Sequence, residues 1–328
     1  MINPTQVAAI VAGAMLSVCV FWTGLDRALA KPVAVSSDAA AGTDVAAAPP
    51  EPQPPHGRVY LFRGALGPIF SRGMDRLTEQ LAAAGIKADV YEFTICRLIA
   101  AQAIRDYRDD PAPITLIGHS MGGLCALTFA EVLQDEHIPV NLVVTIDPAH
   151  ASPKVPLNVG RYINIFLSTS ILGGGDVVAE QGYRGHYASY DLSKQDEVTH
   201  INIDKMDSVH QQLISMIVQL ATTPKMEEGE TVPLRYVVPP GSPVELWDSG
   251  TPLLARSGDT LQKLAAFHHV PPWSLTQINQ LPETAPLTAG QRVIVPRHLM
   301  PASELPVQAP LQRQRAERNG TSMGVRRQ

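Results

Sequence analysis

Residues 114–127, with the sequence ITLIGHSMGGLCAL, carry the residue types best suited to chemistry. Gly118, Ser120 and Gly122 form a G-x-S-x-G pattern, which lies between the apolar run 114–117 and the helix-like stretch 123–130. A serine on a sharp turn between a buried strand and a helix exposes its hydroxyl as a nucleophile, and flanking glycines avoid collisions there. The helix directs its first N–H groups to the place where an oxyanion would develop. The pattern therefore predicts acyl-transfer chemistry at Ser120.

With its GHSMGG sequence, this stretch resembles the elbow of the α/β-hydrolase superfamily, in particular its lipase- and thioesterase-like members. The resemblance implies a Ser-His-Asp mechanism that needs no cofactor and no metal. It also implies that the acid and then the histidine follow Ser120 along the chain. The alternative for the motif is a glycine-rich strand-to-helix turn with an ordinary serine.

Two aspartates compete for the role of the acid. Asp147 follows the strand-like run 142–146, and its Ile-Asp-Pro-Ala context resembles the acid turn of pancreatic-type lipases. Asp176, in the loop GGGDVVAE, matches the commoner superfamily position one strand later. We favour Asp147 and keep Asp176 as the alternative.

Two histidines compete for the role of the base. His210 begins the last amphipathic helix of the domain, expected over 208–220, and this is where the superfamily resemblance puts the base. His200 lies in VTHINID, which we interpret as a strand over 198–203, where such a histidine does not belong. We therefore favour His210 and keep His200 as the alternative.

Oxyanion stabilisation requires two amide donors. Met121, which follows the nucleophile, is expected to supply one N–H, and Gly64 or Ala65, after the first strand, the other. The long loop between Leu167 and Val198 is either a lid over Ser120 or a mobile surface loop.

The chain from 58 to 222 alternates strands with helices, which predicts an α/β fold with a parallel sheet. The resemblance implies that residues 58–222 form an α/β-hydrolase core that is reduced to its central strands. Besides 114–117, strands are expected at 59–62, 88–93, 142–146, 162–167 and 198–203, and helices at 74–84, 95–107 and 208–220.

The C-terminal stretch 253–297 resembles a LysM domain, a small α+β module with βααβ order that binds glycans containing N-acetylglucosamine. Ser257-Gly258-Asp259-Thr260-Leu261, an asparagine at 279 and a Gly-Gln-x-x-x-x-Pro pattern over 290–296 carry the resemblance. Asp259 and Thr260 are suited to cap the first helix. A Pro-rich linker is expected over 223–252, and a basic, disordered tail over 298–328.

The N-terminal 30 residues predict export. Residues 7–22 form an uncharged apolar run, and Ala28-Leu29-Ala30 is a cleavage-type site, so the segment is a cleaved signal peptide or an inner-membrane anchor. The Pro/Ala-rich range 31–57 cannot build a core and reads as a disordered linker. A net charge of −5 gives no reason to expect nucleic acid, and Cys96 and Cys125 do not make a disulfide framework.

These features predict an exported serine hydrolase, in the periplasm or cell envelope, that cleaves a lipid or wall-linked ester. Its LysM module would bind peptidoglycan or another N-acetylglucosamine glycan. Two alternatives stay open: a catalytically inactive glycan-binding envelope protein, and an amidase that acts on wall peptides.

Overall fold

The computed structural model of the chain describes residues 56–222 and 229–298. The predicted export segment, nearly all of the N-terminal linker and the basic tail lie outside the described residues. None of the helices in the described part of the chain is long and apolar enough to cross a bilayer.

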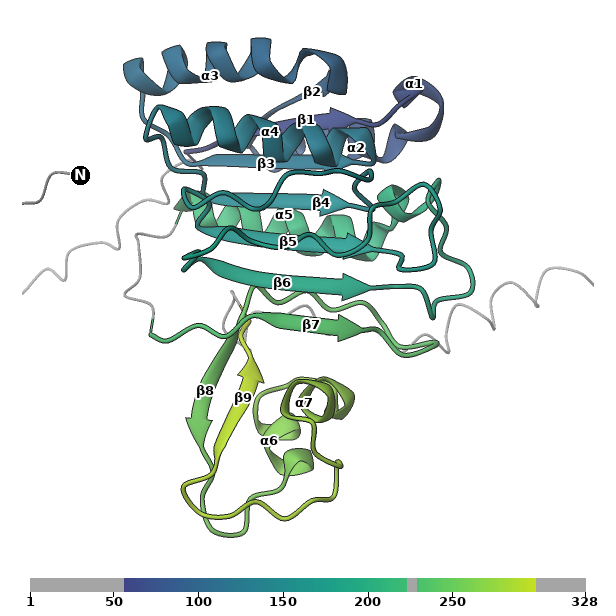
Figure 1. Ribbon diagram of the computed structural model, residues 1–328, viewed down its shortest axis with the longest axis vertical. Coiled ribbons are helices and arrows are strands. Elements are labelled where there is room, and N and C mark those ends of the chain that lie inside the picture. Colours follow the sequence, from purple (N-terminus) through teal and green to yellow (C-terminus); the bar gives the residue numbers. More distant parts are fainter. Residues whose placement is uncertain (1–55, 223–228, 299–328) are drawn as a thin grey trace, which may run out of the picture. The chain divides into compact units, whose positions relative to one another are not determined.

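A sheet of seven parallel strands forms the main core, in the spatial order β2-β1-β3-β4-β5-β6-β7 (Figure 1). The strands are β1 (Arg58–Arg63), β2 (Lys87–Glu92), β3 (Ile114–His119), β4 (Leu142–Ile146), β5 (Arg161–Phe166), β6 (His186–Asp191) and β7 (Leu234–Val237). Because all seven run the same way, the loops after their carboxyl ends share one edge of the sheet, where such folds place their sites. The predicted parallel α/β architecture is confirmed.

Helices cover both faces of this sheet, as its apolar strands require. They are α1 (Gly67–Phe70), α2 (Arg72–Ala83), α3 (Cys96–Asp109), α4 (Met121–Asp135) and α5 (Asp207–Thr222), with 3₁₀ turns η1 (Phe93–Ile95) and η2 (Ile203–Lys205). Leu77 of α2 and Leu213 of α5 belong to the core on one face. Ile99 of α3 and Phe129 of α4 belong to the core on the other face.

Strand β6 occupies the second half of the range that the sequence predicted to be a lid or a mobile loop. All six of its residues are buried. His186 and Tyr187 therefore pair with β5 inside the sheet and do not belong to a surface loop. The strand escaped detection because its polar side chains have partners far along the chain. His186 Nδ1, for example, lies 2.8 Å from Ser249 Oγ.

The range 223–252, predicted to be a linker, contains a strand and buried side chains in its described part, 229–252. Strand β7 lies inside this range and pairs in parallel with β6. Buried and exposed residues alternate along this short strand, with Leu234 and Tyr236 buried. Prolines lie on both sides of the strand but not within it, and this placement is compatible with an edge strand. Trp247 and Asp248, also in the range, are fully buried.

The C-terminal unit has the predicted βααβ order: β8 (Gly250–Leu254), α6 (Leu261–Phe267), α7 (Pro272–Asn279) and β9 (Arg292–Pro296), with β8 and β9 antiparallel. Thr260 caps α6, since its hydroxyl accepts the Lys263 N–H at 3.2 Å. Asn279 joins the end of α7 to β9 through both backbone groups of Ile294, at 2.7 and 2.8 Å.

This unit packs directly on the seven-stranded sheet. Gln277 of α7 bonds to both backbone groups of Val237, at 3.0 and 2.8 Å, and so covers the exposed edge of β7. The Trp273 ring meets that of Tyr236 edge-on, with centroids 5.4 Å apart.

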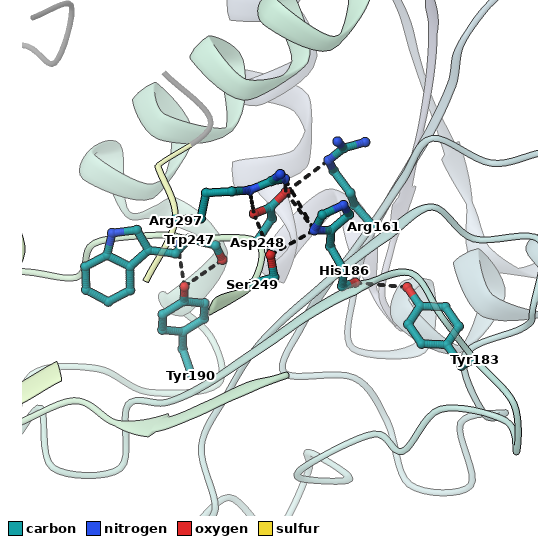
Figure 2. A network of polar contacts seen from close by, with 8 residues as sticks. All are labelled: Arg161, Tyr183, His186, Tyr190, Trp247, Asp248, Ser249 and Arg297. Carbon is teal, nitrogen blue, oxygen red and sulfur yellow. Dashed lines mark hydrogen bonds and ion pairs between the residues drawn. The ribbon is translucent and has the colours of Figure 1, made fainter. Parts of the chain in front are cut away.

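A buried polar network joins the two parts of the fold (Figure 2). The Asp248 carboxylate accepts from Arg161 at 3.0 Å and from Arg297 at 2.6 Å, while the Tyr190 hydroxyl donates to the Trp247 carbonyl at 2.7 Å. Asp248 is fully buried, and a buried charge is tolerated when it is paired in this way.

Candidate active site

Ser120 lies on a sharp turn between β3 and α4, in the strand–turn–helix context that the sequence predicts. Its φ of 56° and ψ of −122° are rare for a residue with a side chain, so the backbone is strained. The flanking glycines make the turn sterically feasible. A Cβ on Gly118 would lie 2.0 Å from the carbonyl oxygen of Gly122, and a Cβ on Gly122 would lie 2.1 Å from that of Phe62.

Three side chains from three loops form a hydrogen-bond series at the carboxyl edge of the sheet. His200 Nε2 is 3.1 Å from Ser120 Oγ, and His200 Nδ1 is 2.6 Å from Asp147 Oδ2. Asp147 follows β4 and is fully buried, and its Oδ1 accepts the Leu167 N–H at 3.2 Å. Since a carboxylate only accepts, Nδ1 donates and Nε2 is left to accept the hydroxyl proton. This arrangement can activate a serine as a nucleophile.

The strand predicted over 198–203 does not exist, and this changes the position of His200. Residues 198 and 199 have no regular structure, and residues 200–202 form a turn that leads into η2. The Asn202 side chain accepts the Thr199 N–H at 2.7 Å, and the Thr199 carbonyl accepts the Asn202 N–H at 3.1 Å. An asparagine that bonds to backbone so close in sequence favours a turn over a strand. His200 therefore lies in a loop beside Ser120.

The structure does not bring His210, our preferred base from the sequence, to Ser120. The residue lies in the first turn of α5 and is fully buried. Its ring nitrogens contact the Gln80 side chain at 3.1 Å and the Asp204 carbonyl at 2.7 Å. Burial lowers the pKa of His210. Its contacts tie α5 to α2 and η2.

Asp176, the alternative acid, lies in a separate cluster. Its carboxylate accepts from Tyr187 at 2.9 Å, from Ser189 at 2.5 Å and from Arg235 at 2.9 Å. The hydrogen bonds from these groups hold the Asp176 pKa below its usual value, although burial alone would raise it. The cluster links the loop after β5 to β6 and β7.

The three predicted oxyanion donors differ in whether their backbone N–H groups already have a hydrogen-bond acceptor. Met121 is the first residue of α4, so its N–H has no intrahelical acceptor. The Gly64 N–H donates to Ser71 Oγ at 3.0 Å. Ala65 is exposed in the same loop. The arrangement leaves Met121 and Ala65 as the better pair of donors.

Two residues that the sequence analysis did not single out support this site. Ser71 precedes α2, but its hydroxyl lies 2.8 Å from His119 Nδ1 and does not cap the helix. Gly173 lies against Asp147, because a Cβ on Gly173 would be 2.1 Å from Asp147 Oδ1. The three consecutive glycines at 173–175 were the only sequence signal for this close approach.

Comparisons with known proteins agree with both resemblances drawn from the sequence. Residues 95–161 match the family model of the thioesterase domain, and residues 255–296 match that of the LysM domain. A comparison with curated proteins found no match.

Several solved structures are similar to parts of this chain. RedJ, a thioesterase of the prodiginine biosynthetic pathway in Streptomyces coelicolor, is 20% identical over 31% of this chain, with a TM-score of 0.24. This chain spans 47% of the length of RedJ. The esterase domain of a Rhodothermus marinus protein is 18% identical over 52% of this chain and 89% of its own, with a TM-score of 0.36.

The fold, the elbow and the family matches define a class of protein. The chain combines a parallel α/β domain, part of which matches the thioesterase domain model, with a C-terminal LysM domain. A LysM domain is a peptidoglycan-binding module and indicates association with the cell envelope.

Proposed function

We propose that this protein is an exported serine hydrolase that cleaves an ester at Ser120, with His200 as the base and Asp147 as the orienting acid. The observation that carries the proposal is the series of hydrogen bonds from Asp147 through His200 to the Ser120 hydroxyl. The strained elbow supports it, since strain of this kind is kept where function requires an exposed nucleophile.

The reaction follows from this geometry. His200 Nε2 takes the hydroxyl proton while Ser120 Oγ attacks the ester carbonyl, and the imidazolium is stabilised by Asp147. The tetrahedral intermediate then collapses, and the leaving alcohol receives the proton from His200. Water, activated by the same histidine, next cleaves the acyl-serine ester and releases the acid. The N–H groups of Met121 and Ala65 are the proposed donors to the oxyanion.

Exposed apolar side chains near these loops favour a lipid or other acyl ester as the substrate. Leu66 and Ile69, just after the oxyanion loop, are 67% and 64% exposed. Ile171 and Leu172, just before Gly173, are 88% and 56% exposed, and Ile201, next to His200, is 49% exposed. An acyl chain bound over such residues would remove apolar surface from water, and this is favourable. A panel of esters of increasing chain length tests this part of the proposal.

Export and glycan binding complete the proposal. The apolar run 7–22, the site at 28–30 and the LysM domain support a location beyond the cytoplasm, with the N-terminal segment cleaved or kept as an anchor. A phosphatase reporter fused after Gly57 should be active in a bacterial host. The purified protein should sediment with peptidoglycan and be released by soluble N-acetylglucosamine oligomers.

A fluorophosphonate probe tests the catalytic site directly. The wild-type protein should be labelled at Ser120, and Ser120→Ala should not be labelled. His200→Ala should slow labelling strongly, whereas His210→Ala should leave labelling of the folded protein intact. An unlabelled wild type would favour the inactive glycan-binding alternative. Peptide release from purified wall would favour the amidase.

A further inference from the structure

His119, the residue before Ser120, lies between the two loops that the proposed reaction needs. It is the last residue of β3, and its side chain is 2% exposed. Its Nδ1 is 2.8 Å from Ser71 Oγ, and its Nε2 is 2.9 Å from the backbone carbonyl oxygen of His200. The rings of His119 and His200 lie 4.9 Å apart. One buried imidazole thus contacts groups from two separate segments.

The chemistry of the partners fixes the direction of each bond. A carbonyl oxygen only accepts, so His119 Nε2 carries the proton. Burial, and secondly the neighbouring His200, lower the pKa of His119 to about 4. Near neutral pH the ring is therefore uncharged, and its Nδ1 accepts a hydrogen bond from the Ser71 hydroxyl. Ser71 Oγ in turn accepts the Gly64 N–H at 3.0 Å.

These bonds form a continuous path from the oxyanion loop to the loop that carries His200. It runs from the Gly64 amide through Ser71 and His119 to the His200 carbonyl. Gly64 itself lies against the nucleophile, because a Cβ placed on it would be 2.8 Å from the Ser120 Cβ. His200 lies in a turn and has no strand to hold its backbone.

We propose that His119 is a positioning residue that, through Ser71 and the His200 carbonyl, holds the oxyanion loop and the base loop in register with Ser120. This inference rests on the proposed function. It assigns His119 no contact with substrate. Its effect on rate arises because a displacement of about 1 Å in a reacting group can lower the rate ~100-fold.

Substitutions at His119 separate its two contacts. His119→Phe removes both nitrogens and keeps the ring shape. His119→Gln puts an amide near the position of Nε2 and keeps a donor for the His200 carbonyl, while His119→Asn puts one near Nδ1 and keeps the Ser71 contact. Tyr190→Phe is the control, because it removes a buried hydroxyl that bonds to Trp247, away from the site.

The measurements are kcat and KM on a soluble short-chain ester and the rate of fluorophosphonate labelling, each per folded molecule. We expect His119→Phe to lower kcat and labelling by ~10- to 100-fold with KM little changed. His119→Gln should recover more of kcat than His119→Asn. Tyr190→Phe should lose stability but keep kcat.

Wild-type kcat in His119→Phe would overturn the proposal, and so would equal kcat losses in His119→Phe and Tyr190→Phe. If His119→Phe does not fold, wild-type kcat in both His119→Gln and His119→Asn overturns it. Failure of the proposed function can be distinguished from failure of this inference. If the proposed function is wrong, the wild-type protein itself does not react with the fluorophosphonate probe.

Discussion

Asp147 shows how much of the proposed chemistry depends on single side chains. It has a positive φ of 40° and no exposed surface, and its two oxygens bond to His200 and to the Leu167 N–H. We expect Asp147→Asn to lower kcat ~10⁴-fold, because an amide can stabilise the wrong tautomer of His200. Steady-state kinetics on a soluble ester checks this result.

Asp176→Asn is the matched control for that substitution. Because its carboxylate holds Tyr187, Ser189 and Arg235, the variant should unfold at a lower denaturant concentration and keep its kcat. An active Asp147→Asn together with an inactive Asp176→Asn would contradict our assignment of the acid.

His119 also predicts how stability depends on pH. Its pKa falls from 6.5 to about 4 on folding, so the unfolded chain binds its proton more readily than the folded protein. The His119 contribution to the free energy of unfolding is therefore complete above pH 6.5, falls as the pH decreases toward 4, and levels off below that. The difference in unfolding free energy between wild type and His119→Phe should change by up to about 3 kcal/mol over this window.

Urea unfolding of the two proteins at a series of pH values measures this difference. Subtracting one curve from the other removes most contributions of the other titrating groups, including Asp204, whose pKa burial raises to about 6. A difference that stays constant between pH 4 and 6.5 would show that His119 is not held neutral by the fold.

At the scale of elements, the loop after β5 determines the position of Asp147 as much as β4 does. Gly173 forms an isolated bridge with Ala149, and its missing side chain leaves room for the Asp147 carboxylate. We expect Gly173→Ala to push this carboxylate or the loop aside and to lower kcat ~10- to 100-fold. The kinetics should be compared with the thermal stability of the variant.

Gly175→Ala, in the same loop, is the control. A Cβ there meets nothing within 4 Å, although its φ is 78°. This variant should lose about 1 kcal/mol of stability from backbone strain and keep its activity. Equal kcat losses in the two variants would mean that the loop as a whole, and not its contact with Asp147, determines the rate.

At the scale of the whole molecule, the described C-terminal unit is packed against the sheet. Asp248 supplies the carboxylate that Arg161 and Arg297 share, and Trp247 contacts the rings of Tyr236 and Trp273. We expect Asp248→Ala to lower the free energy of unfolding by ~3–5 kcal/mol, since it removes one side of a buried ion pair. Urea unfolding followed by circular dichroism measures this loss.

Glu283→Ala, at an exposed position of the C-terminal unit, should change stability by less than about 0.5 kcal/mol. If Asp248→Ala were equally mild, the network of Figure 2 would not be what holds this junction together. The packing also has a practical consequence. Deleting residues 250–298 would uncover the edge of β7, so glycan binding is better tested on the full chain.

The sequence alone determined the features that depend on neighbouring residues. The G-x-S-x-G motif between an apolar run and a helix located the elbow, because strand, turn and helix signals are local. Alternating strands and helices gave the parallel sheet. The SGDTL sequence helped to carry the resemblance to a LysM domain, which implied the βααβ order, and Thr260 was correctly expected to cap its first helix.

Only the tertiary structure decided which histidine meets Ser120. Val198–Ile203 has strand-like composition, but Asn202 bends it into a turn, and the His200 carbonyl is held by His119, a residue 81 positions away. Strands β6 and β7 escaped detection for a related reason: their polar or short sequences are stabilised by partners such as Ser249 and Gln277. Such contacts join segments that are distant in sequence. No local pattern encodes them, and they form only when the sheet brings the segments together.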